Sequence, residues 1–145
     1  MKPTPETAIR WLRQAEHDLT IAQNHRKQGD YSDACFMAEQ ASQKTLKAFL
    51  MAKGQRSVPI HSVAQLAERC SDIDPDFKRL IAAGRILDQY YIPTRYPDAL
   101  APPAVPSNPT RKRKRRELLK RQSLFTAWWQ RSSTLPKKLD GQNVR

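Results

Sequence analysis

Two long stretches of apolar residues at helical spacing occupy the first third of the chain and limit what it can fold into. Across residues 5–28 and 32–52 the apolar side chains recur at steps of three and four, which is the stripe of an amphipathic helix. Only a short Gly-Asp-Tyr turn separates the two, so we expect an antiparallel helical hairpin. The two stripes consist of Ile9, Leu12, Ala15, Leu19 and Ala22, and of Cys35, Phe36, Ala38, Ala41, Thr45, Ala48 and Phe49.

Both helices of this hairpin have recognisable ends. Thr4 is a suitable N-cap, Pro5 suits the first helical position, and Gly29 is a typical helix terminator. We expect Tyr31 and Ser32 to start the second helix, with Ser32 as its cap, and Gly54 to stop it.

Two shorter helices follow the hairpin. Residues 61–70 carry helical spacing after a loop that contains Pro59, and Asp74 followed by Pro75 marks the start of another helix. No strand pattern occurs in residues 1–100. The sequence therefore predicts an all-α fold, an antiparallel bundle of four to five helices.

The last of these helices must end at residues 90–98, which read Tyr-Tyr-Ile-Pro-Thr-Arg-Tyr-Pro-Asp. The two prolines fix φ, remove two N–H donors and push the preceding residues toward extended geometry. Two interpretations of this segment stay open. Either it is a structural clamp in which Arg95 pairs with Asp88 or Asp98, or Arg95 and the tyrosine hydroxyls line a site for an anionic ligand.

The formal net charge of +12 is concentrated near the C-terminus. Residues 1–98 contain 14 Lys/Arg and 12 Asp/Glu, whereas residues 99–145 contain 12 Lys/Arg and only 2 Asp/Glu. A proline-rich stretch lies where the composition changes. We therefore expect a helical domain at 1–100, a Pro-rich linker at 101–110 and a basic tail at 111–145.

Several classes of protein are disfavoured. No run approaches the roughly 18 apolar residues that span a bilayer, and the N-terminus lacks the apolar core of a signal peptide. Cys35 and Cys70 have neither CxxC spacing nor a His cluster nearby, so we expect buried thiols rather than metal ligands. The sequence predicts a cytoplasmic protein without a metal or cofactor.

The helical part of the sequence resembles the HEPN domain, a small helical bundle of prokaryotes and eukaryotes. The resemblance covers about two-thirds of the chain, from residue 7 to about residue 100. Its most specific parts are the Ala-Glu-Gln-Ala-Ser-Gln-Lys run at 38–44 and the proline-bracketed segment 90–98.

This resemblance implies a nucleotide-binding role and frequent homodimers. It also implies, for many prokaryotic members, a partner minimal nucleotidyltransferase encoded beside the HEPN protein in a toxin–antitoxin-like pair. We accordingly predict a polar ligand-binding pocket formed by Gln40, Lys44, Lys47, His61, Tyr90, Tyr91, Arg95 and Asp98.

Each of these side chains also has a structural interpretation. Lys44 and Lys47 share a helix face that is either solvated or in contact with nucleotide phosphates, and Asp18 is a possible ion-pair partner for either lysine. His61 is either a helix cap or part of the site. Trp11 is interpreted as a core or dimer-interface anchor, as is Phe36 of the second stripe.

Other members of the family are metal-independent endoribonucleases with an Arg-x(4–6)-His motif duplicated across a dimer interface. Arg56 with His61 satisfies that spacing, but the two flank a proline-containing loop. Arg10 with His17 also satisfies it, but these residues lie on the first helix, where the family does not keep its site, so Arg56 and His61 are the catalytic candidates. The family motif lies near the start of a late helix, where this chain has Arg95 with no histidine after it. Because such catalysis needs an imidazole, the sequence favours a binding module, with an endoribonuclease toxin as the alternative.

The basic run at 111–116 allows two further interpretations. Its cations neutralise phosphates, and Trp128 and Trp129 offer rings for base stacking, so the tail is a candidate for RNA or DNA binding. Alternatively, residues after about 108 are a frameshifted, divergent or disordered terminus. The family usually ends in an acidic, Ala-rich helix, whose codons read one base out of frame encode Lys and Arg.

Overall fold

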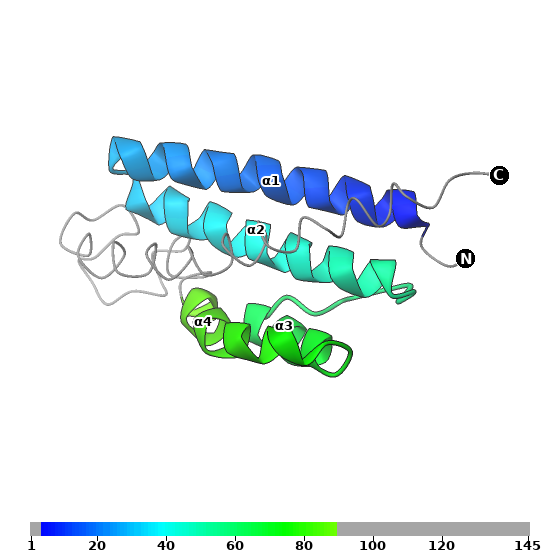
Figure 1. Cartoon of the computed structure of the whole chain (residues 1–145). Helices are drawn as coiled ribbons and strands as arrows, with labels where there is room; N and C mark the ends of the chain where they lie inside the picture. The colour runs from blue at the N-terminus through cyan, green and yellow to red at the C-terminus, as the bar shows by residue number, and fades with distance from the viewer. Residues whose placement is uncertain (1–3, 90–145) are drawn as a thin grey trace.

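The computed structural model describes residues 4–89, and within them the chain is an all-α bundle (Figure 1). Its helices are α1 (Pro5–Gln28), α2 (Tyr31–Ala52), α3 (Val63–Ser71) and α4 (Lys78–Asp88). A 3₁₀ turn, Pro75–Phe77, leads into α4. No strand occurs between residues 4 and 89, so the predicted all-α bundle is confirmed. The predicted linker and tail lie outside the described residues.

The ends of α1 follow from its sequence. The Thr4 side chain accepts a hydrogen bond from the Thr7 N–H at 3.2 Å, and Pro5 occupies the first helical position. Gly29 ends the helix at φ 85°, in the left-handed region that favours glycine. All three predicted boundary residues are confirmed.

Helix α2 starts where predicted, but its predicted cap is wrong. The helix begins at Tyr31, directly after Asp30, and Ser32 is buried inside its first turn instead of capping it. The cause is the tight end of α1, where the N–H of Asp30 bonds to the carbonyl of His25 at 2.9 Å. This bond completes the turn within two residues, so α2 already begins at Tyr31 and Ser32 falls inside the helix.

Helix α2 forms the centre of the described bundle. It packs along α1 on one side and against α3 and α4 on the other, as Figure 1 shows. Phe49 of α2 meets Phe77 with ring centroids 4.5 Å apart. Because α2 is covered from both sides, even several of its polar side chains are buried: Ser32, Glu39, Ser42, Gln43 and Lys47.

Asp88 joins the end of α4 to the start of α3. Its carboxylate accepts hydrogen bonds from the Ser62 hydroxyl at 2.6 Å, the Val63 N–H at 2.7 Å and the Ala64 N–H at 3.2 Å. The Val63 and Ala64 N–H groups belong to the start of α3, where backbone donors have no partners inside the helix. Asp88 is one of the two residues predicted to pair with Arg95, and its carboxylate serves this helix start.

Helices α3 and α4 also approach each other closely at Gly84. A Cβ atom at this position would lie 2.8 Å from the Ala64 nitrogen and 2.9 Å from its Cα. Both atoms belong to the backbone and have little freedom to move aside. Gly84 is therefore required by the packing of the two helices.

We expect the substitution Gly84→Ala to destabilise the protein by roughly 1–3 kcal/mol, because the added methyl group must push the helices apart. The loss outweighs the advantage of alanine in a helix, which is about 1 kcal/mol. Urea denaturation measures the change, with Ala82→Ser on the exposed side of α4 as control. A variant as stable as the parent would contradict the close helix approach.

Candidate functional site

Lys44 and Asp18 form an ion pair between α2 and α1. The Lys44 Nζ donates to Asp18 Oδ2, and the Asp18 side chain is only 3% exposed. The other carboxylate oxygen, Oδ1, accepts from Gln14 Nε2 at 2.8 Å. One of the two predicted pairings of Asp18 is thus confirmed. Both oxygens of this buried carboxylate have partners, as burial of a charge requires.

Lys47 lies next to Trp11 of α1. Its Nζ is 5.9 Å from the centre of the indole ring, a cation–π distance, and the residue is buried. Burial lowers the pKa of Lys47, whereas the nearby Glu39 acts in the opposite direction. Lys47 therefore belongs to the interior between α1 and α2 and not to a solvated face.

Glu39 is a buried carboxyl that the sequence reasoning did not single out. It accepts a hydrogen bond from Gln40 Nε2 at 2.9 Å and another from Gln43 Nε2. Burial raises the pKa of Glu39 to about 7, and the charge of Asp88 adds to this effect. The two glutamine hydrogen bonds and the charge of Lys47 lower the pKa only in part. The sequence signal that could have identified Glu39 is its position inside the Ala-rich run of the second helix.

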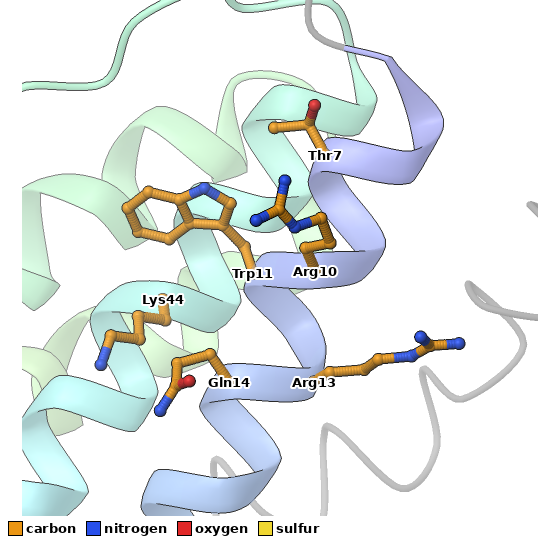
Figure 2. Close-up of a pocket in the computed structure, with 6 residues that line it drawn as sticks. All are labelled: Thr7, Arg10, Trp11, Arg13, Gln14 and Lys44. Atoms are coloured by element: carbon orange, nitrogen blue, oxygen red, sulfur yellow. The ribbon is translucent and has the colours of Figure 1, made fainter.

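A pocket of about 570 Å³ opens between α1 and α2 (Figure 2). Its volume is within the usual range for small-molecule sites. Four of its lining residues lie within seven positions of one another on one face of α1, and one comes from α2. The lining consists of Thr7, Arg10, Trp11, Gln14 and Lys44, with Arg13 at the edge.

The charge of this pocket is positive. Arg10 and Arg13 are exposed and have no ion-pair partner among residues 4–89, whereas the charge of Lys44 is balanced by Asp18. In Figure 2 the guanidinium of Arg10 lies on the same side as Thr7, next to the indole, and Arg13 extends away from the others. A flat ring beside an unpaired cation suits an aromatic anion.

The predicted site residues are only partly brought together. Gln40, Lys44 and Lys47 lie along α2, but only Lys44 lines the pocket. His61 is exposed in the loop before α3 and does not cap that helix, because Ser62 does so by accepting from the Gln65 N–H at 3.1 Å. The predicted ligand residues Tyr90, Tyr91, Arg95 and Asp98 lie outside the described residues.

The two weak catalytic candidates do not lie in the pocket either. Arg56 and His61 are both exposed and belong to the loop between α2 and α3. Neither is among the residues that line the pocket. Nothing in the described part of the chain places them together with the basic residues of α1.

Sequence reasoning missed most of the pocket. It interpreted Trp11 as a core or interface anchor, yet the ring is only half-buried and forms a wall of the pocket. Thr7 and Gln14 were not predicted as site residues, and Arg10 was weighed only as part of a nuclease motif with His17. The available signal was their spacing, because residues at i, i+3, i+4 and i+7 share one face of a helix.

The cysteines are buried thiols, as predicted. Burial raises the pKa of Cys70 to about 12, which makes its reactive thiolate form rare at neutral pH. Between residues 4 and 89, no group of three His, Cys, Asp or Glu side chains is arranged to hold a metal ion. In the same range, no helix is both long and apolar enough to cross a membrane.

The chain is similar to one known family and to a solved structure. The family model described as the HEPN domain matches residues 8–132. The crystal structure of TT1696 from Thermus thermophilus is similar with a TM-score of 0.68 and 37% sequence identity. The similarity covers 83% of this chain and 93% of that one. No curated protein matches the chain significantly.

Glu39 should make stability depend on pH in a way that Glu39→Gln removes. The folded protein binds the Glu39 proton more tightly than the unfolded chain, so this contribution is complete below about pH 4.5 and declines as the pH rises to about 7. Relative to the parent, the neutral variant should gain roughly 2–3 kcal/mol between pH 5 and pH 8.

Urea denaturation of both proteins at several pH values measures this difference. The control is Glu16→Gln, which removes an exposed carboxylate from α1. If the stabilities of Glu39→Gln and the parent differ by the same amount at every pH, Glu39 is not a buried group that titrates near neutrality.

Proposed function

The chain belongs to the HEPN family, and we propose that it is a nucleotide-binding module whose ligand enters the pocket between α1 and α2. The observation that carries the proposal is the position of the Trp11 ring beside the Arg10 guanidinium in a pocket of about 570 Å³. The ring provides a stacking surface and the cation provides a phosphate ligand. A nucleotide has both complementary parts in one molecule.

The energies of these contacts are sufficient for recognition. Stacking of a base on an aromatic side chain contributes about 1–3 kcal/mol, and a hydrogen bond to a charged group about 1.5–3 kcal/mol. Arg10 and Arg13 start without ion-pair partners among the described residues, so no internal ion pair has to be broken before a phosphate binds. The pocket therefore favours a ligand that is both planar and anionic.

The proposal extends to a partner and an assembly. The family relationship supports a homodimer that works with a minimal nucleotidyltransferase in a toxin–antitoxin-like pair. An open pocket on a binding module suits this arrangement, because a bound nucleotide stays accessible to a second protein. Co-purification of the chain with such an enzyme, and its mass in solution, test these two parts separately.

Replacing the stacking surface should weaken nucleotide binding. We expect Trp11→Leu, which keeps an apolar side chain, to reduce the affinity for AMP by about ten- to hundredfold. Isothermal titration calorimetry on the full chain measures the change. The matched control is Trp128→Leu in the tail. Equal affinities of parent and Trp11→Leu would reject the pocket, and a loss confined to Trp128→Leu would indicate binding by the tail.

The endoribonuclease alternative makes a different prediction. Because Arg56 and His61 lie in an exposed loop away from the pocket, we expect the purified full chain to leave total RNA intact. Gel electrophoresis after incubation without metal ions shows the outcome. Cleavage that disappears in His61→Ala would establish the nuclease and refute a purely binding role.

A further inference from the structure

Asp18 binds two residues that line the pocket, one from each of its two helices. Its side chain is almost fully buried, and each carboxylate oxygen has a different partner. Oδ2 accepts from Lys44 of α2, and Oδ1 accepts from Gln14 of α1 at 2.8 Å. Asp18 thus balances the charge of Lys44 and orients the side chains of both pocket residues.

The first consequence concerns Lys44. The negative charge of Asp18 balances the Lys44 ammonium, so Lys44 attracts a phosphate far less than an unpaired lysine would. It keeps N–H groups beyond the one given to Asp18, because an ammonium has three donors. Lys44 therefore offers the pocket a hydrogen-bond donor without a net positive charge.

The second consequence concerns Gln14. Its NH₂ group is directed to Asp18, and this leaves the carbonyl oxygen as the main polar group it can present to a ligand. An acceptor from Gln14 and a donor from Lys44 then lie at the same end of the pocket, as Figure 2 shows. Nucleobases carry a donor next to an acceptor on their hydrogen-bonding edges.

The opposite end of the pocket has different chemistry. Thr7 and Arg10 lie on the other side of the Trp11 ring, in the first two turns of α1 (Figure 2). The Arg10 guanidinium has no ion-pair partner within residues 4–89. The N-terminal turns of a helix also carry partial positive charge. Net positive charge is therefore concentrated at this end.

We propose that Asp18 is a positioning residue that fixes the direction in which a 5′-mononucleotide binds. The base edge meets Gln14 and Lys44, the base stacks on Trp11, and the phosphate lies on Arg10 and Thr7. This inference rests on the proposed nucleotide binding. It adds that the ligand is a single phosphorylated nucleoside and that one buried carboxylate keeps its phosphate away from Lys44.

The phosphate end is tested by comparing AMP with adenosine in titration calorimetry of the full chain. The parent should bind AMP about ten- to hundredfold more tightly than adenosine, because Arg10 contacts the phosphate. Arg10→Ala should abolish most of that difference while it leaves adenosine binding nearly unchanged. Arg26→Ala, at the far end of α1 and outside the pocket, is the matched control and should preserve the difference.

The base end is tested with ribose 5-phosphate, which has the phosphate but no base. Asp18→Asn removes the charge that balances Lys44, so its affinity for ribose 5-phosphate should increase several-fold while the preference for AMP over ribose 5-phosphate shrinks. A role in stability alone would not raise affinity for any ligand. Gln14→Ala, an exposed and therefore safe substitution, should lower AMP affinity and leave ribose 5-phosphate binding unchanged.

These measurements separate the two proposals. If the parent binds neither AMP nor adenosine, nucleotide binding itself is wrong, and the orientation falls with it. If AMP binds but Arg10→Ala weakens AMP and adenosine equally, the orientation alone is refuted. The orientation alone is also refuted if Asp18→Asn and Gln14→Ala both keep the parent's ratio of AMP to ribose 5-phosphate affinity.

Discussion

The burial of α2 between α1 and the α3–α4 pair is the constraint on which both the bundle and its pocket depend. A helix covered on both sides leaves little of its polar side chains to water, so these groups need partners inside the protein. Lys44 meets this requirement with Asp18, Glu39 with two glutamines, and Lys47 with the ring of Trp11. Lys44, held by Asp18, forms the α2 side of the pocket, and the other lining residues belong to α1.

The same constraint explains why the basic residues of the site come from two different environments. Lys44 and Lys47 lie on the buried helix and are compensated or partly desolvated by their neighbours. Arg10 lies on the outer part of α1, where water reaches it and no described carboxylate neutralises it. The more exposed helix thus supplies the net positive charge, whereas the buried helix supplies a lysine whose charge is already balanced.

Sequence reasoning succeeded where the signal was local. The stripe of α1, its Thr4 cap and its Gly29 terminator were all predictable, because each depends on residues within one or two turns. It failed at Ser32 and His61, whose roles depend on how the chain enters the next helix. The pocket escaped prediction because Trp11 looks like a core residue until the distance between α1 and α2 is known.

By itself, the sequence determined the helical class, the long hairpin and the family, because periodic apolar residues and short motifs can be recognised without knowledge of long-range contacts. Only the tertiary structure decided which charges remain available to a ligand. An aspartate 26 positions away neutralises Lys44, whereas nothing described neutralises Arg10. Ion pairing depends on distance in space, and distance between helices is set by packing, which spacing along one helix does not encode.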